Sequence, residues 1–462
     1  MSRLFCFFAA LFFIGIIISC KKQPLNEETT TLLTISEDTL RFDTVFTTLG
    51  STTQYFTITN DNRQKLNISS IQLMGGDASA YKLNVDGAAA VLQNSIEIDP
   101  GDSVYVFVSV TIDPSSDVLP FLVRDSILID MNGHRRFVQL EAYGQNAHFV
   151  RRQTIDADTT WKNDLPYVVY GELTIAENSK LTIEPGCRMY LYADAAIIVE
   201  GTLQAIGTSS DPVSFRGSRL DDIYSELPAS WPGIYFKQNS HDNVLQFCRI
   251  QNAYQGVTAI GFPGASSPKV LLTECIIDNI YDAGILAVNS HIEAINCLVS
   301  NCGSNIVIAA GGQYNFTYCT IVGYDSRFIA HKNPLLTIRN VDDDGQDYPL
   351  DALFRNCIFW SDGTNMEDEI SMDRKGISSF ETVFDHVLYK SKNLPTDIET
   401  ISVIANQDPL FDTVNTNKNI FDFHIGRYAS PAIGAGTPVA IVHDLDGRPR
   451  TGSPDLGCYA KP

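Results

Sequence analysis

The stretch VLLTECIIDN at residues 270–279 has two successors of the same pattern, IEAINCLVSN at 292–301 and YNFTYCTIVG at 314–323. Successive stretches begin 22 residues apart. In each, apolar residues stand five and three positions before a cysteine and two positions after it. With two looser copies, the aligned cysteines are Cys248, Cys275, Cys297, Cys319 and Cys357. A period of this length, made of short alternating apolar runs, predicts a solenoid of strands with one coil per repeat.

The spacing also predicts where the side chains of one repeat point. Alternate residues of a strand share a face, so the apolar residues and the cysteine are expected to point into the coil. The asparagine four positions after the cysteine then falls at a corner, where its amide can satisfy backbone groups that the turn leaves free. These corner residues are Asn252, Asn279 and Asn301.

The first 20 residues have the features of an export signal. Arg3 precedes an apolar run at residues 4–18, which is shorter than a membrane-spanning helix needs. The run ends IISC, which resembles the bacterial lipobox. The resemblance implies a signal peptide at 1–19, a lipid anchor on Cys20 and a tether at 20–32, which is polar and flexible. An uncleaved anchor and an ordinary secretory signal are the alternatives.

Ten cysteines in an exported chain raise the question of disulfides. Coils of a solenoid stack about 4.8 Å apart, so aligned cysteines in neighbouring coils could approach bonding distance. Their position between apolar residues favours free thiols stacked in the core instead. The pattern leaves open the pairing of Cys187, Cys302 and Cys458.

The charge of the chain excludes some partners. Hydrophobic residues make up 44% of the chain, which is a foldable composition, and the net charge is −21. Nucleic acid needs a basic surface, and so does a polybasic membrane patch. We therefore predict no nucleic acid partner and no membrane contact of the polybasic kind.

Residues 33–147 predict a β-sandwich. Short strand-like runs alternate with turn residues, and Val104, Val106, Val108 and Val110 mark one face of a strand. The phrases FDTV at 42–45 and FTITN at 56–60, with IDPG and the closing run up to Gly144, resemble Ig-like domains of the abnormal-spindle and Hydin type. This resemblance implies a spacer or adhesion module.

Residues 148–430 are expected to form the β-helix, with 148–163 joining it to the sandwich. Gly-bounded phrases such as YVVYGELTI and WPGIYF resemble the coils of right-handed parallel β-helix proteins with the pectin lyase fold. The tail, 431–462, resembles the closing segment of the choice-of-anchor Q type. That resemblance implies that the tail closes the last coil, with Asp444, Asp446 and Arg448 in a salt-bridged cap. The fold class is thus all-β, a sandwich followed by a right-handed parallel β-helix.

The repeat loosens between Cys319 and Cys357, where residues 325–351 are expected to form a loop on one corner. This loop contains oxygen-bearing residues at the spacing of a calcium loop, although the closing position is Asp rather than Glu and no flanking helices are expected. The predicted Ca²⁺ ligands are Asn340, Asp342, Asp344, Gln346 and Asp351. A solvated acidic loop is the alternative.

No pattern singles out a catalytic group, so catalytic residues are left unassigned. Pectate and alginate lyases share the fold and need a metal or basic groups, but Arg249, Lys269 and Arg355, expected to point outward, do not recur on one face. His291, His331 and His386 are expected at the surface or at corners.

We predict a bacterial cell-envelope lipoprotein with a binding or structural role, most simply glycan binding along the β-helix flank. Outer-membrane anchoring is expected, and the sequence leaves open whether it faces the periplasm or the cell surface. One alternative is a polysaccharide lyase or glycoside hydrolase, and another is an adhesin or assembly partner that binds an envelope protein. The aromatic residues that could stack on a polymer are Tyr190, Tyr192, Tyr235, Tyr281, Tyr314 and Trp360.

Overall fold

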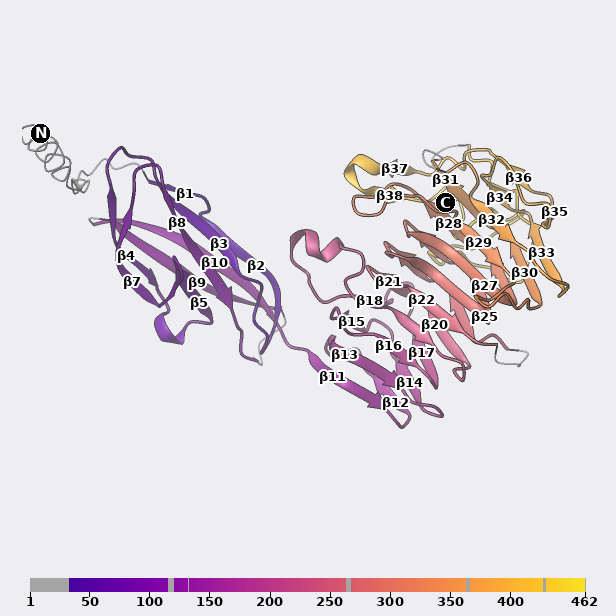
Figure 1. Cartoon of the computed structure of the whole chain (residues 1–462), viewed down its shortest axis with the longest axis horizontal. Coiled ribbons are helices and arrows are strands. Elements are labelled where there is room, and N and C mark those ends of the chain that lie inside the picture. The colour runs from indigo at the N-terminus through magenta and orange to yellow at the C-terminus, as the bar shows by residue number, and fades with distance from the viewer. Residues whose placement is uncertain are drawn as a thin grey trace, which may run out of the picture. The chain divides into compact units, whose positions relative to one another are not determined.

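The computed structural model describes residues 33–461 apart from 115–119, 132, 263–266, 363–365 and 427–428. The predicted signal peptide, Cys20 and the tether lie outside the described residues. The chain divides into two compact units, Met1–Asn146 and Ala147–Pro462. Each unit is described by itself (Figure 1). Within the described ranges, no helix has the length and apolar character needed to cross a membrane.

Two five-stranded sheets build the first unit, in the orders β1-β3-β8-β5-β6 and β2-β10-β9-β4-β7. Their inward side chains share one buried core, in which Phe56 and Val106 of the first sheet join Ile71 and Leu140 of the second. The predicted β-sandwich is confirmed, and its Ig-like assignment stays a prediction. The elements are β1 (Leu33–Ile35), β2 (Thr39–Phe46), β3 (Gln54–Asn60), β4 (Leu66–Leu73), η1 (Gly76–Ala78), β5 (Tyr81–Val85), β6 (Ala88–Ala89), β7 (Leu92–Ile98), β8 (Ser103–Val110), β9 (Phe121–Met131) and β10 (His134–Gln145).

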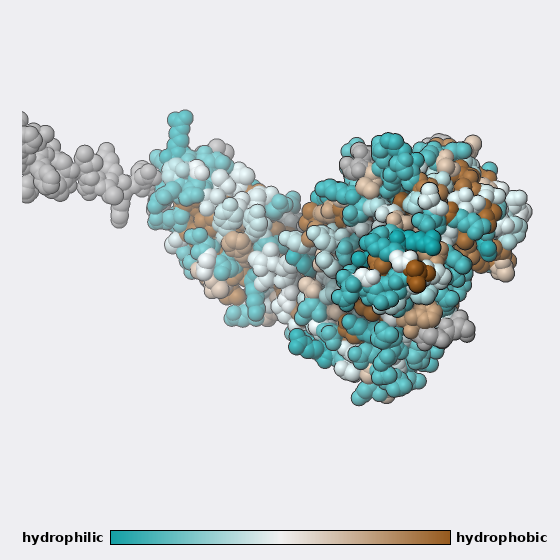
Figure 2. Space-filling view, turned by 45° about the vertical axis from the view of Figure 1, so that its right-hand side comes forward, coloured by the Kyte–Doolittle hydropathy of each residue, from teal (hydrophilic) through white to brown (hydrophobic). Residues whose placement is uncertain are grey.

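The second unit is a parallel β-helix. Its 26-stranded sheet runs from β11 at one end to β35 and β36 at the other (Figure 1), and its strands pair in parallel with their equivalents in the next coil. Alternate side chains point inward and form one long apolar core, because the residues at those positions are mostly Ile, Leu, Val, Phe and Cys. On the face drawn in Figure 2, hydrophilic side chains predominate and apolar ones appear as scattered patches.

The strands of the first coils are β11 (His148–Ile155), β12 (Thr159–Trp161), β13 (Tyr167–Ile175), β14 (Lys180–Ile183), β15 (Arg188–Leu191), β16 (Ile197–Val199), β17 (Thr202–Ile206), β18 (Val213–Gly217), β19 (Ile234–Phe236), β20 (Asn243–Gln246), β21 (Cys248–Gln251) and β22 (Val257–Ile260). Those of the middle coils are β23 (Val270–Thr273), β24 (Ile276–Asp278), β25 (Ala283–Ile295), β26 (Leu298–Ser300), β27 (Ser304–Thr317), β28 (Thr320–Gly323) and β29 (Leu336–Arg339). The remaining elements are β30 (Leu350–Arg355), β31 (Ile358–Ser361), β32 (Ile370–Asp373), β33 (Phe380–Asp385), β34 (Leu388–Tyr389), β35 (Glu399–Ile401), β36 (Ile404–Ala405), β37 (Thr413–Asn415), β38 (Ile420–Asp422) and the 3₁₀ turns η2 (Asp222–Glu226) and η3 (Thr416–Lys418).

The five aligned cysteines occupy one column of the core. The register pairs the residue after each cysteine with its equivalent in the next coil, as Arg249 with Ile276 and Ile276 with Leu298. All five are buried, and all eight cysteines within the described residues are free thiols. The residue before each cysteine has a positive φ, for example 51° at Glu274 and 50° at Asn296, so the chain bends there in the left-handed region.

Two expectations about irregular segments are wrong. Residues 148–163 do not merely join the two units, because β11 and β12 lie there and pair with β13 and β14. Residues 325–351 are not wholly a loop either. They contain β29, whose apolar residues continue the rows of β27 and β32.

The C-terminal segment does not close the last coil, contrary to the sequence-based expectation. It runs along the side of the β-helix, where Cys458 N donates to Thr320 Oγ1 in β28 and Arg450 reaches Asn296 in an earlier coil. Figure 1 accordingly shows the C-terminus beside β28 and β31. The segment covers an outward apolar row, with Leu445 and Leu456 packing in one cluster with residues of β26, β28 and β31. The predicted ion pair is present, with Arg448 Nη2 3.1 Å from Asp446 Oδ2.

Candidate functional site

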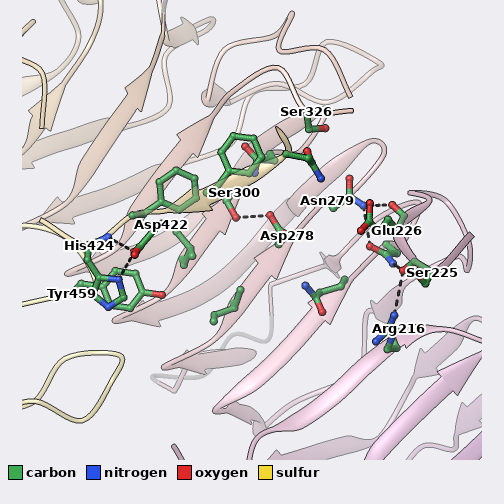
Figure 3. Close-up of a pocket in the computed structure, with 18 residues that line it drawn as sticks. Arg216, Ser225, Glu226, Asp278, Asn279, Ser300, Ser326, Asp422, His424 and Tyr459 are labelled. Atoms are coloured by element: carbon green, nitrogen blue, oxygen red, sulfur yellow. Dashed lines mark hydrogen bonds and ion pairs between the residues drawn. The ribbon is translucent and has the colours of Figure 1, made fainter. Parts of the chain in front are cut away.

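The candidate site is an open cleft of about 730 Å³ on the outer face of the β-helix (Figure 3). Its floor consists of outward side chains of β21, β24 and β26. One wall is the segment that contains η2, and the other is the hairpin β37–β38 with the chain that follows it. The lining residues are Arg216, Ser225, Glu226, Gln251, Asn252, Ile276, Asp278, Asn279, Leu298, Ser300, Asn301, Ser326, Asn419, Phe421, Asp422, Phe423, His424 and Tyr459.

A row of polar side chains crosses the floor from coil to coil. The parallel register pairs Gln251 with Asp278 and Asp278 with Ser300, so these side chains repeat at the strand spacing of about 4.8 Å. Ser300 Oγ donates a hydrogen bond of 2.7 Å to Asp278 Oδ1 (Figure 3). Burial raises the pKa of Asp278, although hydrogen bonds from Ser300, Gln251 and Asn301 oppose the rise.

The corner asparagines hold the first wall. Asn252 Nδ2 donates to Ser225 O and Asn279 Nδ2 donates to Glu226 O, each at 2.7 Å. Arg216 Nη2 also donates to Ser225 O, at 3.2 Å (Figure 3). Asn252 and Asn279 therefore hold the segment that bounds the cleft. The sequence alone predicts only that they satisfy backbone groups at the corner of the coil.

Asn301 is the third corner asparagine, and its side-chain oxygen is available to a ligand. It is buried, and its Oδ1 atom has no hydrogen-bond partner within the described structure. A buried carbonyl oxygen without a partner costs about 1–3 kcal/mol. A hydroxyl group bound in the cleft could donate to this atom.

The second wall carries aromatic rings and a histidine. His424 lies between two carboxylates, with Nδ1 2.5 Å from Asp422 Oδ1 and Nε2 2.9 Å from Asp446 Oδ2, and its ring stacks on Tyr459. Burial alone would lower the pKa of His424, but the hydrogen bonds to Asp446 and Asp422 outweigh burial and raise it. Phe421 forms the apolar part of this wall.

This arrangement suits a neutral, hydroxyl-rich ligand. Amide and hydroxyl groups can each donate and accept hydrogen bonds, while the aromatic edge can cover an apolar face of the ligand. Three carboxylates, those of Glu226, Asp278 and Asp422, also line the cleft. A carboxyl group whose pKa is raised by burial, as that of Asp278 is, is a feature of acid–base sites.

The five residues predicted to bind Ca²⁺ lie in and after one tight turn. Asp342 Oδ1 accepts from the backbone N–H groups of Asp344 and Gln346, and Asn340 exchanges two hydrogen bonds with the backbone of Lys375. Asp351 follows in β30 and is exposed. Across the described ranges, no group of three or more His, Cys, Asp or Glu side chains could hold a metal ion. These contacts explain the turn without a metal, and the Ca²⁺ site stays a prediction.

Several other predicted surface residues lie elsewhere. Tyr314 and Trp360 are buried, whereas Tyr281 is 54% exposed and stacks on Tyr254. Lys269 is buried rather than outward, and its Nζ donates to three backbone carbonyls at 2.8–2.9 Å. His331 is also buried, with Nε2 2.9 Å from Glu369 Oε2.

Arg249 and Arg355 do point outward. Arg249 lines a smaller cavity of about 340 Å³ together with Glu274 and Arg448, and Arg355 pairs with Asp385 at 2.7 Å. Neither residue lines the cleft.

Sequence reasoning did not find the cleft. Asp278 and Ser300 stand at the same outward position of two repeats, one residue before the corner asparagine, and this alignment was a usable signal. His424 and Tyr459 could not be placed, because the repeat pattern says nothing about a segment that folds back along earlier coils.

Comparisons with known proteins add little. No family model matches the chain, and no curated protein matches it. One solved structure that is similar in part is described as "The details of glycolipid glycan hydrolysis by the structural analysis of a family 123 glycoside hydrolase from Clostridium perfringens". The match has 10% sequence identity and a TM-score of 0.19, and it covers 27% of this chain and 31% of that one. A similarity of this extent supports no argument about fold or activity.

Proposed function

We propose that the protein is a lipid-anchored protein of the bacterial envelope whose β-helix binds a glycan in the cleft between the η2 segment and the β37–β38 hairpin. The observation that carries the proposal is the polar row Gln251, Asp278 and Ser300 with the unpartnered oxygen of Asn301 beside it. A stacked row offers similar hydrogen-bonding groups at regular steps, which a polymer of repeating hydroxyl-rich units can use together.

Equilibrium binding to a panel of neutral and acidic oligosaccharides tests this proposal. Asn301→Gly, which keeps the positive φ of this corner, and Ser300→Ala should each weaken binding of the bound oligosaccharide by roughly tenfold, the effect of one lost hydrogen bond in a water-poor site. Thr337→Ala, on an outward position of β29 outside the cleft, is the matched control and should bind as the unchanged protein does. Absence of binding across the panel would refute the glycan assignment.

Hydrolysis or lyase chemistry in the same cleft is the second candidate. The pKa of Asp278, which burial raises, favours it, because burial shifts a carboxyl group toward the protonated form that a general acid needs. Release of reducing ends or of an unsaturated product, lost in Asp278→Asn, would support catalysis. Binding without turnover across the panel would leave the protein as a binding module.

The lipid anchor is tested separately. Mass spectrometry of the mature protein should find acyl chains on Cys20, and Cys20→Ser should release the chain from membranes. A mature N-terminus at another residue would refute the anchor without affecting the cleft.

A further inference from the structure

The two outer faces of the sandwich differ in kind. On the sheet β2-β10-β9-β4-β7, charged residues form ion pairs across the strands: Glu141 lies 3.5 Å from Arg41 and 3.2 Å from Arg124, and Lys65 lies 3.1 Å from Glu97. Phe137 and Tyr143 of β10 and Leu122 of β9 are also exposed on this sheet, on the same strands as these charges. A mixture of charged and apolar side chains is typical of a face that water covers.

The opposite sheet presents an aromatic face. Tyr55 of β3 and Tyr105 and Phe107 of β8 point outward and are 55%, 46% and 37% exposed. Their ring centroids are 5.6–6.0 Å apart, so the three rings form one continuous patch, called here the aromatic face. Three large rings gathered in water cost free energy that a partner surface would recover.

The surroundings of the aromatic face carry almost no charge. Among the described outward positions of β3, β5 and β8, Lys82 is the one charged side chain. The others on these strands are hydroxyl or amide residues: Thr57, Thr59, Asn84, Ser103 and Ser109. Asp86 follows β5, is exposed, and donates from its backbone N–H to Tyr105 O, so one carboxylate and one ammonium group lie beside the rings. In a chain of net charge −21, an anionic surface repels a face whose charges balance less than it repels the rest of the chain.

The start of the sandwich places this face near the predicted anchor. β1 is the edge strand of the same sheet and pairs with β3, with Leu33 opposite Asn60. Tyr55 lies five residues along β3 from Asn60, a distance of roughly 17 Å. The 13 residues from Cys20 to Leu33 span at most about 45 Å, so a lipid anchor on Cys20 would leave the aromatic face within reach of the membrane surface.

From these observations we propose that the aromatic face of Tyr55, Tyr105 and Phe107 docks on the lipid surface that holds the anchor. The proposal rests on the proposed lipidation of Cys20 for its geometry, not on the glycan cleft. Tyrosine suits this position, because its ring can enter the boundary between headgroups and acyl chains while its hydroxyl stays hydrated. A second contact of this kind would orient a protein that a single lipid anchor leaves free to turn.

Hydrogen exchange of the full lipidated chain tests the docking. In vesicles of phosphatidylcholine and phosphatidylglycerol, amides of β3 and β8 should exchange at least tenfold more slowly than in the Cys20→Ser chain free in solution. Amides of β9 and β10, in the opposite sheet, should be unchanged and serve as the internal control. Equal exchange of β3 and β8 in both states would overturn the proposal.

Variants separate docking from tethering. The Cys20→Ser chain should float weakly with the same vesicles, and Tyr55→Ser with Tyr105→Ser and Phe107→Ser should abolish flotation, whereas Tyr143→Ser on the opposite sheet should not. Thr57→Asp with Ser109→Asp, which keeps the rings, should also reduce flotation.

If β3 and β8 are instead protected by added oligosaccharide or by raised protein concentration without vesicles, the face binds glycan or a second copy and the proposal fails. Lack of acylation on Cys20 with flotation intact would refute the anchor alone.

Discussion

Asn279 Nδ2 donates a hydrogen bond of 2.9 Å to Asn252 Oδ1 in the preceding coil. Both residues have positive φ angles, 56° and 64°, in which asparagine is tolerated better than most residues. The same two amides bind the backbone of the η2 segment. One column of side chains therefore shapes the corner of the β-helix and fixes a wall of the cleft.

Asn279→Gly should loosen that wall without straining the corner, because glycine adopts a positive φ without cost. The loss of two hydrogen bonds should lower the free energy of unfolding by about 1–2 kcal/mol. Hydrogen exchange of residues 223–228 should become faster. Asn301→Gly, which removes the corner amide that does not hold the wall, is the matched control. If both variants loosen the η2 segment equally, the asparagine contacts do not fix the wall.

The eight described cysteines, five of which form the column, should behave as inaccessible thiols. Burial raises the pKa of Cys275, Cys297 and Cys319 well above the ordinary range, so few thiolates form at neutral pH. A thiol reagent should label none of the eight described cysteines in the folded protein and all eight after denaturation without reductant. Fewer than eight labelled thiols in denaturant would show that disulfides form between coils.

Arg450 should hold the C-terminal segment against the β-helix. Its Nη2 atom donates to Asn296 Oδ1 at 2.9 Å and to Gly457 O at 2.8 Å, and its guanidinium lies 3.9 Å from the centroid of the Tyr318 ring. Arg450→Ala should lower the free energy of unfolding by about 2–4 kcal/mol, because charged hydrogen bonds in a buried setting are lost. Arg450→Lys should be intermediate, since it lacks the planar fork.

Limited proteolysis checks the same prediction. Arg450→Ala should expose segment 431–461 to cleavage while the coils stay resistant. Arg339→Ala removes only an exposed ion pair with Asp343 and should change stability by less than about 0.5 kcal/mol. Equal protease resistance of the Arg450→Ala variant and the unchanged protein would show that other contacts suffice to hold the segment.

The fold could be predicted from sequence because its information is local and repeated. Cys275 and Cys297 occupy the same position in two successive repeats, and the apolar residues around each are buried in the same way. The pattern of one repeat therefore predicts the structure of the next. The β-sandwich followed from alternation in β8 for a similar reason.

The cleft could be predicted only in part, because it depends on contacts between distant residues. Asp278 and Ser300 occupy the same position of successive repeats, so an alignment of the repeats is enough to pair them. His424 pairs with Asp446, and Tyr459 packs in one cluster with Leu298 of a much earlier coil, and no periodicity encodes either contact. Lys269 looked like a surface residue because a lysine that donates to three backbone carbonyls has no sequence signature.

His424 should make the second wall of the cleft sensitive to pH. Its pKa is raised in the folded protein by Asp446 and Asp422, so its ion pairs stabilise the fold fully below the unfolded pKa of about 6.5. That stabilisation is lost as the pH rises through the higher folded pKa. The melting temperature should therefore fall between pH 6 and the raised pKa, and the fall should be absent in His424→Gln. His241→Gln, on an exposed residue that does not line the cleft, should keep the pH dependence. A melting profile of His424→Gln that is parallel to that of the unchanged protein would show that another group causes the fall.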